Sequence, residues 1–406
     1  DDALQLLHRA VELGPPEIHV ELWRRIAEAS ALKYDGEGFW QAMQNAIALA
    51  ADRTARADLY SVLAYETTVR LGMWRSRPDQ TMVKRWVDEA LELSEEGTAA
   101  RVRALAALSA WDSTGGLEVA RQAVALAERL GTNELITAAR LQLVESALAS
   151  GSMDEALEEA ATNLELLEST PNPDDREGIY WAATLANLGC GRMEQARFQA
   201  SRLAEAAREL SPHHRIHAAG LRLMVEELAG RWETVRVLTH DAEAAVRENL
   251  STPCNLNARS LLVCALASAQ TGDDEEARRL ETSADDLEME GYGLTIEAPR
   301  LRLSLLRSDL EEAERLLEVG EAMYFARTAA TAARLDALVA LGRRERVEEE
   351  AEPHLRPNSY LKPFALRALG RVREDDELVL QALERFEAMG LDWHAAETRA
   401  LLSADN

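Results

Sequence analysis

Hydrophobic residues recur along this chain three or four positions apart, which is the spacing of one face of an α-helix. A representative stretch holds Ala156, Leu157, Ala160, Leu164 and Leu167, at steps i, i+1, i+4, i+8 and i+11. Polar and acidic residues fill most positions between them, so the predicted helices are amphipathic. Because no segment has the pattern of a β-strand, the sequence predicts an all-α protein.

The helices are predicted to form antiparallel pairs joined by short turns. The predicted pairs are 17–33 with 38–51, 54–71 with 79–95, 98–113 with 116–130, 133–150 with 152–168, 174–190 with 192–210, 213–229 with 231–249, 254–271 with 273–290, 295–307 with 309–320, 323–341 with 343–352, and 359–370 with 374–389. Two single helices are also predicted. The helix over 1–13 is interpreted as the second half of a hairpin from a longer, truncated polypeptide, and the helix over 392–403 is expected to cap the stack.

A glycine followed five positions later by an alanine marks the turn inside several pairs. The signal occurs at Gly115 with Ala120, Gly151 with Ala156, Gly191 with Ala196 and Gly272 with Ala277. Three further turns are variants of it: a serine stands in place of the glycine at Ser308 with Ala313, and a valine stands in place of the alanine at Gly230 with Val235 and Gly342 with Val347. Glycine lets the backbone leave a helix through a positive φ. The alanine is expected where the second helix lies closest to the first, since a bulky side chain there would separate the pair.

These turns follow one another at a nearly constant interval. Counted from Gly36 and Gly72 onward, the steps are 36, 43, 36, 40, 39, 42, 36 and 34 residues. A period in this range is typical of helical solenoids. We therefore predict a right-handed α-solenoid of about ten antiparallel hairpins, with residues 1–406 forming a single continuous array. Solenoids present extended surfaces, so the sequence predicts a binding scaffold.

The turn sequences resemble the tetratricopeptide repeat. Leu148-Ala-Ser-Gly151-Ser-Met-Asp-Glu-Ala156 and Ala269-Gln-Thr-Gly272-Asp-Asp-Glu-Glu-Ala277 match that family's turn and its small residue in the second helix. The period exceeds the 34 residues usual in that family, and most aromatic positions of its first helix are missing here. The chain thus resembles a longer, degenerate variety of the repeat.

Two further segments resemble the region C-terminal to the ATPase module in bacterial cyclase-like signalling proteins and ATP-dependent transcriptional activators. The first runs from Leu22 to Met43, with Ala57-Asp-Leu-Tyr60 and Gly72-Met-Trp-Arg-Ser-Arg-Pro78 following it; the second runs from Phe386 to Leu401. The resemblance implies a regulatory arm that receives a partner or a small ligand and restrains the ATPase. No cyclase or ATPase residue is carried over, because neither module lies in these 406 residues.

Composition and charge narrow the class of partner. The formal net charge is −26 and the pI is near 4.8, which opposes direct binding to nucleic acid or to anionic lipid. The longest nearly continuous apolar stretch, 261–269, is far shorter than the roughly 20 residues that span a bilayer, so no membrane segment is predicted. Three cysteines, Cys190, Cys254 and Cys264, form no disulfide framework, and we expect a cytoplasmic protein.

Motifs for catalysis are not found in the sequence. No lysine follows a glycine as a phosphate-binding loop requires. His213 and His217 lie one helical turn apart, which is the spacing of a two-histidine metal pair; the more common alternative is that they are ordinary polar residues lining an inner face. We therefore predict no catalytic residues, no cofactor and no metal, and expect that the chain is not an enzyme.

Aromatic residues are concentrated near the N-terminus. Nine of them lie between positions 23 and 111: Trp23, Tyr34, Phe39, Trp40, Tyr60, Tyr65, Trp74, Trp86 and Trp111. One interpretation is a core filled by large side chains. The other is an aromatic recognition surface, helped by Arg70, Arg75 and Arg77 near Trp74, because aromatic residues and arginine dominate binding hot spots.

The first helices of the hairpins are expected to line the inner wall, and they supply most of the candidate contact residues. Those candidates are Tyr65, Arg70, Trp74, Arg77, Tyr180, Asn187, His217, Arg259 and Gln270. His217 and Arg259 occupy equivalent places in consecutive hairpins and would form a positive stripe for an acidic peptide or metabolite. Two functions remain open: an interaction and regulatory arm that binds a protein or peptide segment, including its own upstream ATPase domain, or a sensor that holds a small effector.

Overall fold

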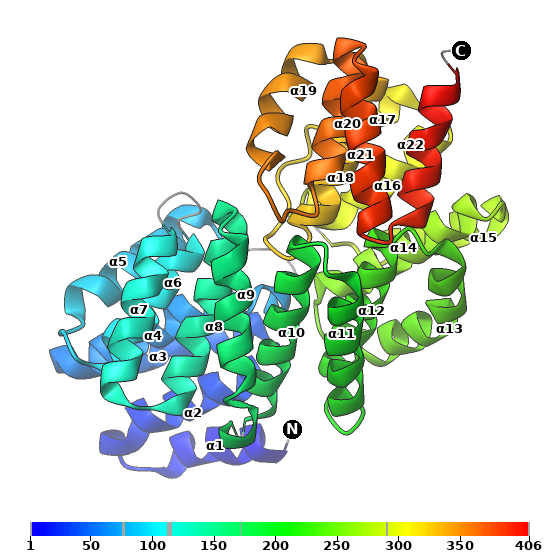
Figure 1. Cartoon of the computed structure of the whole chain (residues 1–406). Helices are drawn as coiled ribbons and strands as arrows, with labels where there is room; N and C mark the ends of the chain where they lie inside the picture. Colours follow the sequence, from blue (N-terminus) through cyan, green and yellow to red (C-terminus); the bar gives the residue numbers. More distant parts are fainter. Residues whose placement is uncertain (1, 75–77, 112–115, 171, 290, 405–406) are drawn as a thin grey trace. The chain divides into compact units, whose positions relative to one another are not determined.

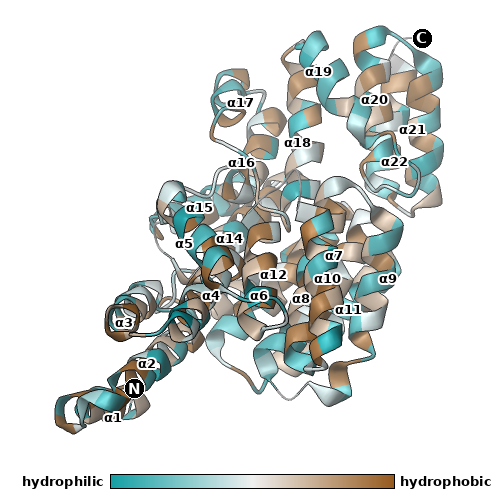
Figure 2. Ribbon diagram, turned by 90° about the vertical axis from the view of Figure 1, so that its left-hand side faces the viewer, coloured by the Kyte–Doolittle hydropathy of each residue, from teal (hydrophilic) through white to brown (hydrophobic). Residues whose placement is uncertain are grey.

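The computed structural model describes residues 2–74, 78–111, 116–170, 172–289 and 291–404. Over these residues it contains 22 α-helices and four short 3-10 turns, and no β-strand (Figure 1). Most helices carry hydrophobic and hydrophilic residues along their length, as expected for helices with one buried face (Figure 2). The contacts between residues divide the chain into two compact units.

Unit 1 comprises residues 1–150 with 165–175 and 251–254. Its helices are α1 (Asp2–Leu13), α2 (His19–Leu32), α3 (Gly36–Leu49), α4 (Arg53–Val69), α5 (Gln80–Leu93), α6 (Ala99–Trp111), α7 (Gly116–Leu130) and α8 (Asn133–Ser150). Each helix packs on the next, and the first helices of successive hairpins also contact one another, α4 with α6 and α6 with α8. Through this second set of contacts the first helices α4, α6 and α8 lie side by side, and we call them the inner row of unit 1.

Unit 2 comprises residues 151–164, 176–250 and 255–406. Its helices are α9 (Met153–Leu164), α10 (Pro173–Gly189, whose first residues belong to unit 1), α11 (Met193–Ala207), α12 (Pro212–Leu228), α13 (Trp232–Glu248), α14 (Asn255–Gln270), α15 (Asp274–Asp285), α16 (Leu294–Leu306), α17 (Leu310–Leu316), α18 (Arg327–Ala340), α19 (Arg344–Ala351), α20 (Lys362–Arg373), α21 (Asp376–Ala388) and α22 (Asp392–Ala404). Here too the first helices form an inner row, in the order α12, α14, α16, α18 and α20.

The predicted turns explain why hairpins form at this period. Gly151, Gly191, Gly230, Gly272 and Gly342 all have positive φ, and so does Ser308, which replaces glycine at its turn. The residue five positions later is fully buried in each case, including the two valines: Ala156, Ala196, Val235, Ala277, Ala313 and Val347. The prediction of an all-α array of helical hairpins is confirmed.

The two most N-terminal glycines of the predicted series do not form such turns. The left-handed residue between α2 and α3 is Tyr34, with a φ of 56°, and Gly36 is the first residue of α3. Gly36 is needed for close packing, because a Cβ atom there would lie 2.7 Å from Cε3 of Trp74. Gly72 lies in the 3-10 turn Leu71–Met73. Gly115 lies outside the described residues.

Aspartate side chains fix the start of several helices. The carboxylates of Asp35, Asp52, Asp273, Asp309 and Asp375 accept hydrogen bonds from backbone N–H groups in the first turns of α3, α4, α15, α17 and α21. A capping side chain satisfies a donor that the helix itself leaves unpaired. This is one reason why the observed helix boundaries lie within a few residues of the predicted ones.

Unit 2 contains contacts between distant parts of the chain that an open array would lack. We call residues 356–393 the closing segment. The backbone N–H of Tyr360 in this segment donates to the carbonyl of Gly189 at 2.9 Å. Trp393 of the same segment packs closely on Gly230: a Cβ atom added to Gly230 would lie 2.8 Å from the Cβ atom of Trp393. The indoles of Trp232 and Trp393 also meet edge to face at 5.3 Å. The closing segment therefore packs on turns of the first hairpins of unit 2.

Candidate binding sites

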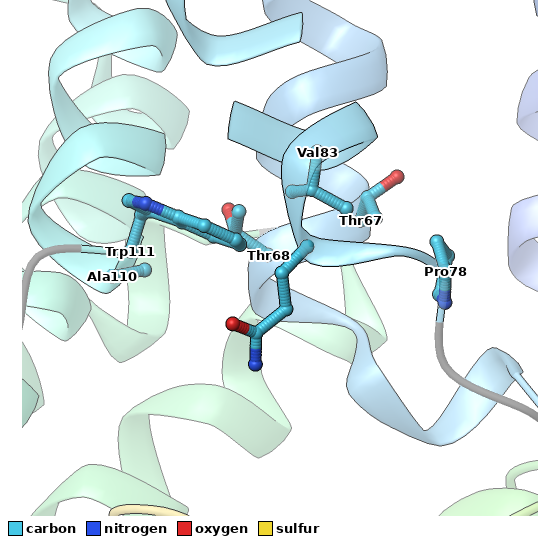
Figure 3. A pocket seen from close by; sticks show the side chains of 7 residues that line it. Thr67, Thr68, Pro78, Val83, Ala110 and Trp111 are labelled. Carbon is cyan, nitrogen blue, oxygen red and sulfur yellow. The ribbon is translucent and has the colours of Figure 1, made fainter. Parts of the chain in front are cut away.

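A cavity of about 160 Å³ lies in unit 1 between three consecutive helices (Figure 3). Figure 3 shows Trp111 on one side of the cavity and Pro78 on the other. Its lining comes from the end of α4, the start of α5 and the end of α6: Thr67, Thr68, Pro78, Gln80, Val83, Ala110 and Trp111. Two of these residues, Gln80 and Ala110, are exposed to solvent. The lining combines apolar side chains, among them Val83 and Trp111, with the polar side chains of Thr67, Thr68 and Gln80.

Two threonines of α4 supply the polar groups of this cavity. Thr68 Oγ1 donates to the carbonyl of Ala64 at 2.9 Å and is therefore satisfied. Thr67 is 3% exposed, and its Oγ1 has no hydrogen-bond partner in the structure. A buried hydroxyl without a partner is uncommon, since most such groups are hydrogen-bonded. Thr67 can therefore hydrogen-bond a group that enters the cavity.

The nine N-terminal aromatic residues belong to one hydrophobic core in unit 1. Tyr34, Phe39, Trp74 and Trp86 are buried in it, and the other five pack against it partly exposed. Of the two interpretations, core filling describes most of this set. Trp74, a candidate contact residue, is only 5% exposed; Tyr65 is half-buried. Arg75 and Arg77, the latter also a candidate, lie outside the described residues.

Arg70, another candidate, is held by charged partners within unit 1. Its Nε lies 2.5 Å from Glu66 Oε2, and its Nη1 lies 2.5 Å from Asp174 Oδ2. The guanidinium also lies over the ring of Tyr34, 5.8 Å from its centroid. These contacts fix the orientation of Arg70, so it acts first as a cross-link between α4 and the start of α10.

Asp175 gives this charged cluster a dependence on pH. Burial raises the pKa of Asp175 to about 6, and the carboxylates of Asp174 and Glu66 add to the rise against the opposing effect of Arg70. A carboxyl whose pKa is higher in the folded state stabilises the fold below its unfolded pKa of 3.8, and this contribution is lost as pH rises through 6.

We therefore expect Asp175→Asn to be more stable than the wild type at pH 7.5 by about 1–2 kcal/mol. The difference should vanish near pH 4, where Asp175 is protonated in the folded wild type. Urea denaturation at a series of pH values measures it. Asp174→Asn is the control, because it removes an ion-pair partner of Arg70 and should destabilise at pH 7.5. A constant difference between Asp175→Asn and wild type from pH 4 to 7.5 would contradict this assignment.

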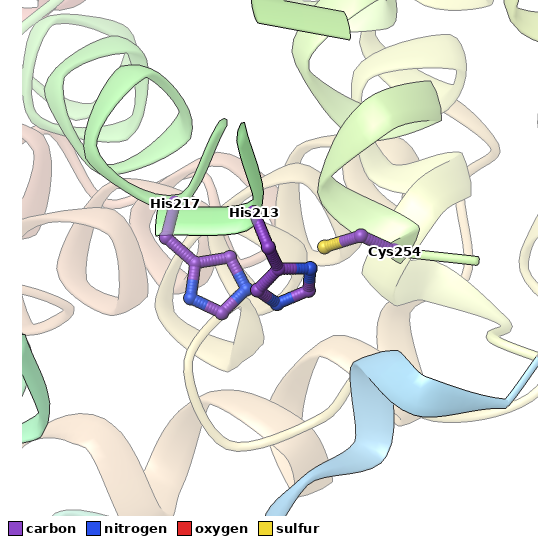
Figure 4. Close-up of side chains that lie close together, drawn as sticks. All are labelled: His213, His217 and Cys254. Carbon is purple, nitrogen blue, oxygen red and sulfur yellow. The ribbon is translucent and has the colours of Figure 1, made fainter. Parts of the chain in front are cut away.

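His213 and His217 lie on one face of α12, as predicted, with ring centroids 4.1 Å apart (Figure 4). His217 Nδ1 is 2.5 Å from Glu177 Oε1, and His214 Nε2 is 3.5 Å from Glu177 Oε2. Glu177 is buried on α10. One carboxylate therefore ties α10 to the start of α12 through two histidines. Its contact with His217 is made to Nδ1 of that ring.

The remaining inner-row candidates of unit 2 differ in exposure. Tyr180 is 7% exposed, whereas Asn187 and Gln270 are half-buried. The Asn187 amide donates to the carbonyl of Ala183 at 2.7 Å, one turn earlier on α10. Asn187, Gln270 and His217 thus keep part of their side chains accessible within unit 2.

Arg259 does not contribute to a positive stripe. It is 2% exposed, and its Nη2 lies 2.6 Å from Oε2 of Glu227, which is 1% exposed. Its Nη1 donates to the carbonyl of Thr295 at 3.4 Å. This pairing could not be predicted from the sequence, because Glu227 belongs to another hairpin. With His217 facing Glu177 and Arg259 facing Glu227, both residues of the predicted stripe have a carboxylate partner.

The three cysteines are buried free thiols. Burial raises the pKa of Cys190 to about 11 and that of Cys264 to about 12. A thiol must ionise to act as a nucleophile, so these two side chains are unreactive near neutral pH.

Comparisons with known proteins show a likeness to solved structures. No protein-family model and no curated protein matches this sequence. Among solved structures the chain is similar to the apo form of the quorum sensor NprR from B. thuringiensis, with a TM-score of 0.49 and 11% sequence identity. The match covers 91% of this chain and 97% of that chain. Among the described residues, no helix combines the length and apolar character needed to cross a bilayer.

Proposed function

We propose that this chain is a non-catalytic interaction and regulatory arm that binds a segment of a protein through the cavity of unit 1. The observation that carries the proposal is the size and lining of that cavity. Small-molecule sites usually measure about 300–1,000 Å³, and this cavity measures about 160 Å³. A cavity of about 150 Å³ holds a group the size of benzene. The cavity therefore suits one large apolar side chain of a longer segment.

The lining also favours a segment over a free metabolite. Trp111 and Val83 offer apolar contact to an inserted side chain, and aromatic walls are common where one anchor residue dominates binding. Thr67 and Gln80 supply hydrogen-bonding groups to the backbone beside that anchor. These features support the peptide-binding hypothesis over the small-effector hypothesis.

We further propose that the arm belongs to a larger signalling ATPase, cyclase-like protein or transcriptional activator, whose ATPase it restrains. The support is the sequence resemblance of residues 22–43 and 386–401. In that setting the bound segment comes from the ATPase module itself or from a regulatory partner.

Peptide selection against the purified chain tests the proposal. Peptides selected from a random display library should share one large apolar side chain. Their affinity should fall about tenfold or more in Ala110→Trp, which places an indole at the mouth of the cavity. The matched control is Ala396→Trp on α22, another exposed alanine to tryptophan change, which should leave affinity unchanged. Selected peptides that bind Ala110→Trp as well as wild type would overturn the proposal.

A further inference from the structure

The inner row of unit 2 buries several charged side chains, and most of them have a partner of opposite charge. Glu227 pairs with Arg259 at 2.6 Å. Arg367, which is 8% exposed, lies 2.8 Å from Oδ1 of Asp336. Each of these arginines is therefore compensated by a carboxylate on a neighbouring inner helix.

Arg302 is the exception. It lies on α16 and is 9% exposed, and neither of its terminal nitrogens, Nη1 and Nη2, has a hydrogen-bond partner in the structure. A guanidinium remains protonated in proteins. A buried charge is unfavourable when no counter-charge is in hydrogen-bonding contact with it, so the fold places a cation where a bound anion would be stabilised.

The positive charge of Arg302 acts on the pKa values of two buried groups from another part of unit 2, Tyr360 and His394. The Leu228 carbonyl accepts a hydrogen bond from the Tyr360 hydroxyl at 2.6 Å and faces Nε2 of His394 at 3.2 Å. Burial lowers the pKa of His394 well below its usual value, and the charges of Arg302 and Arg367 lower it further. His394 is therefore neutral, with its proton on Nε2 facing the carbonyl, and its Nδ1 is an acceptor.

Two acceptors in this region have no partner. They are Nδ1 of His394 and Oε1 of Glu227, and both residues are 1% exposed. The core of unit 2 thus contains two acceptor atoms, on His394 and Glu227, and two donor nitrogens, on Arg302, that have no hydrogen-bond partner among the described residues. A small acid that also carries a hydrogen-bond donor matches this set, since its carboxylate accepts from the guanidinium and its donor meets an acceptor.

We propose that the core of unit 2 contains an anion-binding site at Arg302, which takes one carboxylate from a ligand that also bears a hydroxyl or amino group. The site is separate from the cavity of unit 1 and does not depend on the function proposed for that cavity. The carboxylate comes either from a free small acid or from the C-terminus of a peptide.

Thermal unfolding in matched salts tests the site. The wild type should unfold about 2–4 °C higher in saturating glycolate than in chloride of equal ionic strength, with a smaller rise in acetate, which lacks the donor. Arg302→Met should show no such rise and, in chloride, should be at least as stable as wild type, because it removes an uncompensated charge. Arg367→Met is the control: it removes a paired arginine, so it should unfold at a lower temperature and keep the response to glycolate.

Direct binding to the wild type keeps the test independent of the folding of the variants. Titration with ¹³C-labelled glycolate should reveal one saturable site. A tripeptide with a free C-terminus that competes, when its amide does not, assigns the site to peptide termini; failure of both to compete assigns it to free acids. Absence of saturable carboxylate binding, or an Arg302→Met variant that is destabilised and still responds to glycolate, would overturn the proposal.

Discussion

Replacing Glu227 with alanine should lower the free energy of unfolding of unit 2 by about 3–5 kcal/mol. Glu227 is 1% exposed and is the carboxylate partner of Arg259, which is 2% exposed. Without it, Arg259 becomes a buried charge whose ion-pair partner has been removed. Urea denaturation followed by circular dichroism measures the change.

Two controls separate the lost ion pair from other effects. Glu276→Ala removes an exposed partner of Arg279 and should cost less than about 1 kcal/mol, as surface pairs usually do. The double change Glu227→Leu with Arg259→Met replaces the pair by apolar groups and should recover most of the loss. If Glu227→Ala costs no more than Glu276→Ala, the buried pair does not exist in solution.

Gly230→Ala should be more destabilising than Gly272→Ala, although both glycines occupy the same place in their turns. Both have positive φ, at 67° and 88°, so an alanine at either position costs about 1–2 kcal/mol of backbone strain. A Cβ at Gly272 meets nothing within 4 Å, whereas a Cβ at Gly230 would lie 2.8 Å from Cβ of Trp393. This steric conflict should add about 1–3 kcal/mol at Gly230.

Equilibrium unfolding of the two variants side by side measures the difference. Their shared strain cancels in the comparison, so the excess at Gly230 reports only the contact with the closing segment. Gly230→Ala should show no such excess when it is made in a Trp393→Gly background, because that change removes both the indole and the Cβ atom that the new methyl group would meet. Equal destabilisation by the two glycine substitutions would argue against the packing of α22 on this turn.

The hairpins could be predicted from sequence because their causes are local. The helical spacing of apolar residues, the glycine of the turn and the alanine five positions later all lie within one repeat. They amount to one rule: a residue with positive φ is followed five positions later by a buried residue, and the turn at Ser308 follows this rule without a glycine. The rule missed Tyr34 and Glu374, which have φ of 56° and 55°. Neither residue type signals a left-handed conformation, yet Phe39 and Val379, five positions later, are buried as the rule requires.

The sites could not be predicted because their causes are not local. Whether Arg259 is a contact residue depends on Glu227, 32 positions away, and nothing in the sequence of α14 encodes that partner. The cavity of unit 1 is formed where the ends of α4 and α6 meet the start of α5, so it depends on how three helices pack. The division of residues into two units and the packing of the closing segment are likewise set by contacts between distant segments. The proposal of one continuous array over residues 1–406 remains a prediction.

The central structural claim is that unit 2 closes by packing its C-terminal helices on the turns of its first hairpins. Amide hydrogen exchange of Trp393→Ala measures this most directly. We expect faster exchange over residues 226–235, which hold the Gly230 turn, and unchanged exchange over 268–277, which hold the Gly272 turn. Unchanged exchange over 226–235, or an equal rise at both turns, would contradict the claim.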